Sequence, residues 1–232
     1  MKKRYYILII TLILVINFLM VFVAKNKFSH ITQDIVNESE YFSMNATYDK
    51  FPKYTDIKDL DALELESDLI LKVEVKGKKE YVHEDTLAPV EVKEVIKGAI
   101  SDDIKIAEPL SISNYNTNAN VYGGYVPLIP GKEYIVFLKN TNLKNVYKYA
   151  SLEFGHFSLD RKESNIYDYS NSSTKKVKDI VFYDFLYIYG DSKNKIEMLD
   201  KDDPNQILTI DMSQLKQSFV KLKEQCFNKY HN

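Results

Sequence analysis

Histidines beside acidic residues are the first places in this sequence where chemistry could occur. His83-Glu84-Asp85 lies in a polar stretch between two apolar segments, without a second pair of ligands at helical spacing. A solvated turn is therefore favoured over a metal or acid–base site. His156 follows Gly155, and we interpret it as a structural histidine at the end of a strand. The catalytic alternative combines His156 with scattered carboxylates such as Asp68 or Glu153.

Other segments with potentially reactive side chains lack residues that a functional site would need. Asp200-Lys201-Asp202-Asp203 is similar to part of a calcium loop, but Pro204 replaces the turn and no distal glutamate follows at the required spacing. Cys226, the single cysteine, lies on the apolar side of a predicted helix, where a buried, inert thiol is expected. Motifs of serine enzymes, zinc proteases and phosphate loops are absent. The sequence predicts no catalytic residue, no metal and no cofactor, and it favours a protein that is not an enzyme.

Three tyrosines in a turn-rich stretch form the candidate ligand-binding site. Tyr115, Tyr122 and Tyr125 lie within Asn114–Gly131, which we expect to be one long loop. Tyrosine offers a large contact area at low entropic cost, and long loops of small barrels carry ligand contacts. The chain has 18 tyrosines, however, so a tyrosine-rich loop also follows from composition alone. Both interpretations stay open.

The composition limits the class of protein. The chain has 232 residues, of which 45% are hydrophobic and 28% charged, so it can bury a core. Its formal net charge of −2 argues against nucleic acid as a partner, because phosphate binding requires clustered positive charge. One cysteine cannot make an internal disulfide framework or a cysteine zinc cage.

An uncharged segment near the N-terminus predicts a membrane anchor. Residues 5–24 carry no charge and only two polar side chains, Thr11 and Asn17, and basic residues lie on both sides. Twenty helical residues span about 30 Å, which is the hydrocarbon thickness of a bilayer. The lipid bilayer is therefore an expected partner of residues 5–24, and residues 1–27 form the anchor with its basic flanks.

A cleaved signal peptide, which would release a secreted protein, is the alternative to this anchor. The apolar run is longer than in most signal peptides, and a cut after Ala24 would place Phe22 where a small residue is needed. More basic residues precede the segment than follow it closely, which favours an extracytoplasmic position for the rest of the chain. Five of the 31 basic residues lie in 1–27, so the remainder has 26 against 33 acidic residues, about −7, which does not suggest adhesion to anionic lipid.

The body of the chain is predicted to be mainly β with flanking helices, in the α+β class. Alternating apolar residues and glycine turns predict a series of short strands over 69–75, 90–97, 104–112, 133–139 and 146–154. The alternation of apolar residues in the second strand shifts by one position along its length, which predicts a bulge near Lys93-Glu94. The strand at 133–139 is apolar on both faces, so it should be central. A hairpin is expected over 155–167.

Helical spacing and composition divide the rest of the chain. Helices are predicted over 57–65 and 213–229, while the apolar residues 177–189 fit a helix or a strand equally well. The predicted domains are an anchor over residues 1–27, a stalk over 28–55, an OB-like β-barrel over 56–168 and a C-terminal α/β extension over 169–232. The extension is expected to pack on the barrel.

Three segments carry a resemblance to a known class of domain. Ser67–Val73, Glu94–Gly98 and Gly131–Leu138 resemble strands of bacterial surface domains with an oligonucleotide/oligosaccharide-binding (OB) barrel, which are similar to the netrin-like module of tissue inhibitors of metalloproteinases. The resemblance covers roughly 67 to 160 and implies a small OB-like barrel. The animal inhibitors use disulfides and an N-terminal cysteine that binds the protease zinc. No cysteine precedes Cys226, so that mechanism is not expected here.

The favoured function is a membrane-anchored, extracytoplasmic, non-catalytic binding or accessory protein. Its expected partner is an envelope protein or a wall polymer. One alternative is an envelope enzyme with an unfamiliar carboxylate and histidine site. Another is an immunity or accessory protein for a neighbouring membrane system, in which residues 177–189 dock against the neighbour.

Overall fold

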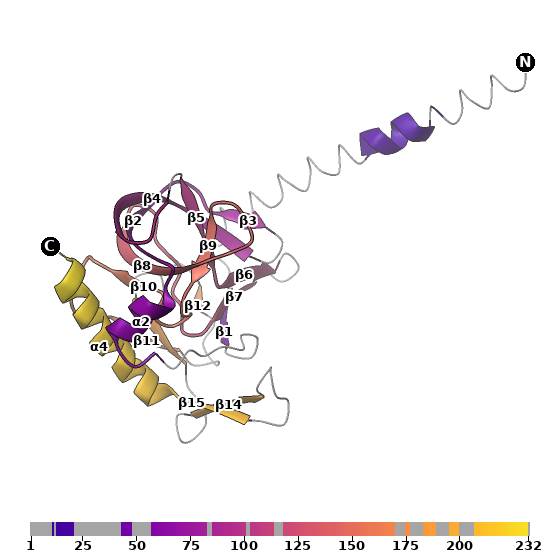
Figure 1. Cartoon of the computed structure of the whole chain (residues 1–232). Coiled ribbons are helices and arrows are strands. Elements are labelled where there is room, and N and C mark those ends of the chain that lie inside the picture. Colours follow the sequence, from indigo (N-terminus) through magenta and orange to yellow (C-terminus); the bar gives the residue numbers. More distant parts are fainter. Residues whose placement is uncertain are drawn as a thin grey trace, which may run out of the picture.

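Five strands close into a small barrel at the centre of the computed structural model (Figure 1). They are β2 (Leu69–Val75), β4 (Asp85–Lys97), β5 (Ile104–Glu108), β8 (Glu133–Asn140) and β9 (Val146–Tyr149). β2, β4 and β5 pair antiparallel in that order, β9 adds parallel to β5, and β8 closes the ring by pairing antiparallel with both β9 and β2. The prediction of a mainly β protein with a small barrel is confirmed, and the architecture is consistent with an OB-like barrel.

Several parts of the chain are outside the structural description. The structure describes residues 11, 13–20, 43–47, 57–82, 85–100, 103–113, 118–169, 175–176, 183–188, 195–199 and 207–231. Residues 13–20 are helical. The rest of the predicted anchor, apart from residue 11, lies outside the described residues, as does most of the predicted stalk. Among the helices that are described, none has the length and apolar character needed to cross a membrane.

The barrel core follows the apolar pattern of its strands. β8 is buried from Tyr134 through Leu138, which confirms that this strand is central. The register between β2 and β4 changes at the predicted bulge, because Lys72 faces Glu94 while Val73 faces Val92. One residue of β4 is therefore unpaired at this point, and the alternation of inward and outward side chains is restored beyond it.

A second sheet of four described strands lies beside the barrel, and three of these strands were not predicted from the sequence. Its order is β12 (Lys175–Lys176), β1 (Ser43–Thr47), β7 (Asn118–Tyr122) and β6 (Leu110–Ser113). β7 falls within the predicted loop Asn114–Gly131, so that loop prediction is wrong for these residues. Asparagine has a low intrinsic strand propensity, but β7 gains ladder partners on both sides, β6 antiparallel and β1 parallel. β1 falls within the predicted stalk.

The expected hairpin over 155–167 does not form. β10 (His156–Ser158) pairs with the barrel strand β8, whereas β11 (Ile166–Tyr169) pairs in parallel with β13 (Phe185–Ile188). β13 also shows that residues 185–188 of the apolar segment 177–189 form a strand. Three further strands are β3 (Glu80–Val82), which pairs with β4, and the antiparallel pair β14 (Lys195–Leu199) and β15 (Ile207–Asp211).

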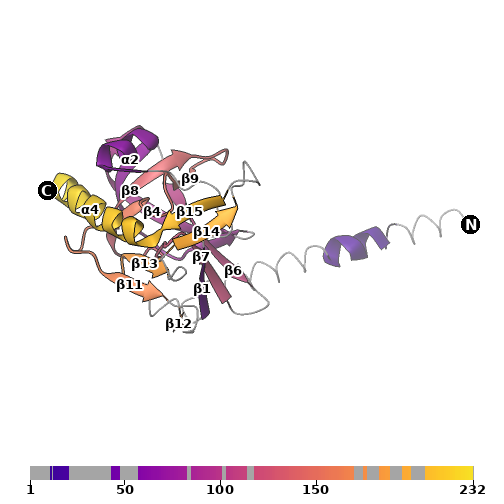
Figure 2. The same cartoon turned by 90° about the horizontal axis from the view of Figure 1, so that it is seen from below.

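Two helices flank the barrel. α2 (Leu60–Glu66) begins at Asp59, whose side chain accepts a hydrogen bond from the backbone N–H of Ala62. α4 (Met212–Tyr230) lies beside β11 and β13 (Figure 2) and buries an apolar stripe that includes Phe219 and Cys226. The cysteine is fully buried, and burial raises the pKa of its thiol, as expected for an inert core residue. Both predicted helices are confirmed.

Candidate functional site

A pocket of about 340 Å³ lies between the barrel and the C-terminal part of the chain, and we call it the flank pocket. Its size is at the lower end of the range for small-molecule sites. Its apolar wall is made of Val126, Pro127, Ile129, Phe157, Tyr183 and Phe219. Its polar wall is made of Lys132, Tyr134, His156, Ser158, Asp160, Arg161, Asn165 and Asp184. The barrel strand β8, the strand β10 that pairs with it, the segment before β8 and helix α4 all contribute to it.

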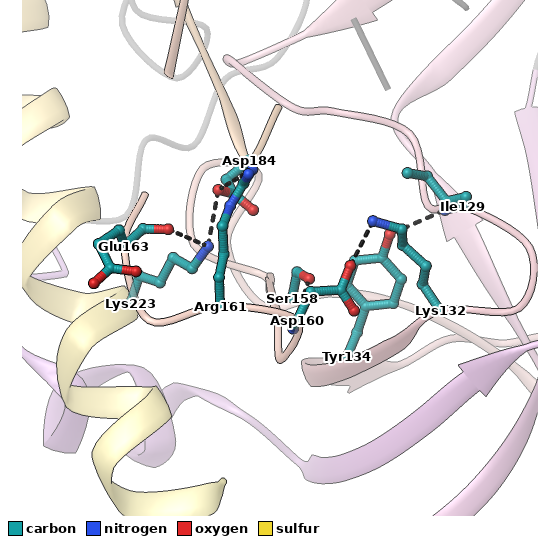
Figure 3. A network of polar contacts seen from close by, with 9 residues as sticks. All are labelled: Ile129, Lys132, Tyr134, Ser158, Asp160, Arg161, Glu163, Asp184 and Lys223. Carbon is teal, nitrogen blue, oxygen red and sulfur yellow. Dashed lines mark hydrogen bonds and ion pairs between the residues drawn. The ribbon is translucent and has the colours of Figure 1, made fainter. Parts of the chain in front are cut away.

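On one side of the flank pocket, the buried carboxylate of Asp184 forms ion pairs with two cations (Figure 3). Asp184 Oδ2 lies 2.8 Å from Nζ of Lys223 and 3.3 Å from a guanidinium nitrogen of Arg161, and it accepts a 2.7 Å hydrogen bond from the backbone N–H of Asn165. The Lys223 side chain is fully buried, whereas that of Arg161 is 42% exposed. Burial lowers the pKa of Lys223, and its ammonium also donates to the carbonyl of Glu163 at 3.2 Å. Asp184 therefore holds one buried and one outer positive charge.

The opposite side of the flank pocket is built from β8 and the turn before it. Lys132 forms an ion pair with Asp160, and the hydroxyl of Tyr134 accepts a 3.1 Å hydrogen bond from the backbone N–H of Ile129 (Figure 3). Burial raises the pKa of Tyr134, so the phenol stays neutral at physiological pH and keeps a proton that it can donate. This side thus offers one ammonium and one hydroxyl.

His156 lines the pocket and lies among three tyrosine rings. Its ring centroid is 5.0 Å from that of Tyr125, 5.7 Å from that of Tyr134 and 5.4 Å from that of Tyr149. Gly155 permits this packing, because a Cβ there would lie 2.4 Å from a backbone oxygen and 2.6 Å from the Tyr149 ring. Burial lowers the pKa of His156 to about 4, so the imidazole is neutral at physiological pH. Its Nδ1 is buried without a hydrogen-bond partner in the described structure.

A second buried carboxylate fixes the segment that forms the apolar wall. Glu108 is 1% exposed, and its Oε1 accepts hydrogen bonds from the Tyr125 hydroxyl at 2.5 Å and the Leu128 backbone N–H at 2.8 Å. The ammonium of Lys79 lies 2.8 Å from the same carboxylate. Val126 and Pro127 lie between Tyr125 and Leu128, so the two hydrogen bonds to Glu108 fix the position of this wall of the pocket.

The tyrosines predicted as a ligand site point into the protein where the structure describes them. Tyr122 is 6% exposed and its hydroxyl lies 3.1 Å from Oγ of Ser111, while Tyr125 is 1% exposed and donates to Glu108. Tyr115 lies outside the described residues. That this stretch binds a ligand stays a prediction. The sequence analysis considered His156, which lines the flank pocket, but it missed the other lining residues, for which the one available signal was the arginine Arg161 in a lysine-rich chain.

The carboxylates considered for the catalytic alternative do not line the flank pocket with His156. Asp68 accepts a 2.8 Å hydrogen bond from the backbone N–H of Asn140, and Glu153 accepts one at 3.0 Å from the hydroxyl of Ser151. His83-Glu84 and the segment Asp200-Lys201-Asp202-Asp203 lie outside the described residues. Among the residues that are described, no three His, Cys, Asp or Glu side chains come together as metal ligands.

Glu153 is expected to make the stability of the protein depend on pH. Burial raises its pKa from 4.5 to about 7, so the folded chain holds a proton there that the unfolded chain has lost. The stabilisation is complete below about pH 4.5 and is lost as the pH rises to about 7. Glu153→Gln should therefore match the wild type near pH 4 and exceed its stability by about 2–3 kcal/mol at pH 8. Urea unfolding across this pH range measures the difference.

Glu163→Gln, which changes an exposed carboxylate, is the matched control for this measurement. His156 titrates in both proteins, so its own effect cancels in the comparison. Parallel stability curves for the wild type and Glu153→Gln from pH 4 to pH 8 would contradict the expected role of Glu153.

The groups in the flank pocket are arranged for binding more than for proton transfer. A general base works best with a pKa near the working pH, whereas His156 titrates at about 4 and the two pocket carboxylates are engaged by cations. Mixed apolar and polar walls, by contrast, are typical of small-ligand sites. No family model matches the sequence, and no curated protein matches it either.

Proposed function

We propose that the chain is a membrane-tethered, extracytoplasmic and non-catalytic binding protein, whose OB-like barrel holds a component of the cell envelope in the flank pocket. The observation that carries the proposal is the pocket itself. It has a size suited to a small ligand and an apolar wall next to fixed polar groups, and its histidine is held neutral. Binding requires such a surface, while catalysis requires a poised base or nucleophile.

The tether is supported by the N-terminal sequence. Residues 5–24 carry no charge, and within the described helical residues the large apolar side chains are exposed, with Phe18 at 74% and Met20 at 66%. Apolar side chains exposed together on a helix favour contact with lipid or another apolar partner. The resemblance of the barrel to netrin-like modules is part of the same proposal and concerns the barrel alone.

Cysteine labelling of intact cells tests the position of the barrel. In a full-length Cys226→Ser background, Lys144→Cys places a thiol on the exposed turn between β8 and β9, and Lys2→Cys places one before the anchor. A membrane-impermeant maleimide should label Lys144→Cys in intact cells and Lys2→Cys only after permeabilisation. The reverse pattern, or recovery of the full-length chain in the soluble fraction, would contradict the proposed tether.

Site-specific photo-cross-linking tests binding through the flank pocket. A photoreactive amino acid at position 183 lies in the pocket, whereas one at position 144 lies on the barrel turn and serves as the control. Cross-links to envelope material should form from position 183 and be weak from position 144. Equal yields from both positions would mean that the pocket is not the binding site.

A further inference from the structure

The charged side chains that line the flank pocket balance one another. They are two cations, Lys132 and Arg161, and two anions, Asp160 and Asp184. Lys132 pairs with Asp160, and Asp184 pairs with Arg161. Asp184 also pairs with Lys223, which has no exposed surface that a ligand could contact. A charged ligand would have to displace a member of these pairs or enter without a counter-ion, and either costs free energy, so the pocket favours an uncharged ligand.

Two hydroxyl groups in the pocket each have a proton left to donate. The Tyr134 hydroxyl accepts a 3.1 Å hydrogen bond from the backbone N–H of Ile129. Ser158 Oγ accepts one of 3.2 Å from the backbone N–H of Asp160, and Figure 3 shows Ser158 between Arg161 and Lys132. A hydroxyl is a donor as well as an acceptor, and the described residues supply no acceptor for either proton. Both groups can therefore donate to oxygens of a ligand.

The imidazole of His156 is a third uncharged polar group in the pocket. It is neutral at physiological pH, and within the described part of the chain its buried Nδ1 has no hydrogen-bond partner. Buried polar atoms are seldom left without a hydrogen bond. A neutral imidazole has one donor and one acceptor nitrogen, and a hydroxyl group can pair with either, because it both donates and accepts. A ligand with several hydroxyl groups thus suits all three polar groups.

The apolar wall indicates what carries these hydroxyl groups. The half-buried ring of Tyr183 lines the pocket together with aliphatic side chains, among them Val126 and Ile129. A sugar ring presents C–H groups on one face and hydroxyl groups around its rim, so it can cover an apolar surface while its rim makes hydrogen bonds. The volume of about 340 Å³ is that of a site for a small ligand. A sugar ring therefore matches both walls.

We propose that the flank pocket binds an uncharged sugar unit, whose oxygens accept hydrogen bonds from Tyr134 and Ser158 and whose apolar face packs on Tyr183. A hydroxyl group of the sugar pairs with the imidazole of His156. The two ion pairs of the pocket stay intact on binding, so a charge on the sugar gains no partner. This inference rests on the proposed function and specifies its ligand.

A matched series of sugars tests the proposal on the full-length protein in a detergent without a sugar headgroup. The probes are uncharged N-acetylglucosamine, anionic N-acetylglucosamine 6-phosphate and cationic glucosamine, which share one ring. An uncharged acetylated dipeptide amide is the peptide probe. Titrations followed by saturation-transfer NMR, in a buffer of about pH 6 that keeps glucosamine protonated, measure the affinities. N-acetylglucosamine should bind about 10-fold or more tightly than either charged sugar.

Variants then show whether the uncharged polar groups hold the sugar. Tyr134→Phe and His156→Phe should each weaken binding of N-acetylglucosamine about 5-fold, and Ser158→Ala about 3-fold, because each removes one hydrogen bond to the sugar. Tyr149→Phe is the matched control, since it removes a buried hydroxyl from a residue that does not line the pocket. Melting temperatures report the fold of each variant, and Ser158→Ala changes the least buried of the three positions.

Three results would each overturn the proposal. They are binding of a charged sugar as tight as that of N-acetylglucosamine, wild-type affinity in all three pocket variants, and tighter binding of the dipeptide amide than of any sugar. Cross-links from position 183 to envelope material that persist when the uncharged sugar is not preferred would remove this inference and leave the proposed function standing. Absence of both would remove both.

Discussion

Asp184→Ala is expected to destabilise the folded protein by about 3–5 kcal/mol, because it leaves the ammonium of Lys223 buried without its counter-ion. The Lys223 side chain has no exposed surface and lies 2.8 Å from Asp184. The carbonyl of Glu163, at 3.2 Å, would be the one remaining hydrogen-bond partner among those that the structure shows. Urea unfolding of the full-length protein in detergent, followed by near-ultraviolet circular dichroism, measures the loss.

A double variant separates the cost of the unpaired charge from other effects of the substitution. Asp184→Ala combined with Lys223→Met removes both charges and keeps an unbranched apolar side chain in the space of Lys223, so much of the lost stability should return. Lys223→Met alone should be milder than Asp184→Ala, since Asp184 would still pair with Arg161. A loss below about 1 kcal/mol in Asp184→Ala would show that water or another group compensates Lys223.

Glu108→Ala is expected to cost a similar amount, about 3–5 kcal/mol, and to weaken the flank pocket as well. The substitution removes the acceptor of the Tyr125 hydroxyl and of the Leu128 N–H, and it leaves Lys79 without its carboxylate. The apolar wall between Tyr125 and Leu128 then loses its two anchors. Urea unfolding measures the stability, and the yield of photo-cross-links from position 183 measures the state of the pocket.

Glu91→Ala is the matched control for Glu108→Ala. Glu91 is also a strand glutamate paired with lysines, Lys76 and Lys93, but its side chain is 49% exposed. Exposed ion pairs contribute about 0–1 kcal/mol, so this variant should stay close to the wild type. Similar losses from the two substitutions would show that burial is not what makes Glu108 important.

The pocket depends on the C-terminal part of the chain as much as on the barrel. Phe219 and Lys223 both come from α4, and Phe219 also stacks on Phe185 of β13 at a centroid distance of 4.7 Å and packs near Phe157 of β10. The same helix is held at its far end by Glu64 of α2, which accepts a 2.5 Å hydrogen bond from Tyr230. The helix therefore completes the flank pocket and fastens it to the barrel.

The sequence by itself determined those features that depend on local periodicity. The alternation in β2, the bulge opposite Lys72, the two-sided burial of β8 and the helix α4 all followed from which side chains are apolar and how they are spaced. The small barrel was also expected, although from a resemblance of strand patterns. The anchor over residues 5–24 and the extracytoplasmic position remain predictions from the same kind of pattern.

Only the tertiary structure decided which distant residues meet. The parallel pairing of β5 with β9, the strand β7 in an asparagine-rich stretch and the contact of Arg161, Asp184 and Lys223 join segments that no local pattern relates. Periodicity shows which face of a helix or strand is buried. It does not show which other element packs against that face. The flank pocket exists because long-range strand pairing and the packing of α4 bring its charged and aromatic side chains to one place.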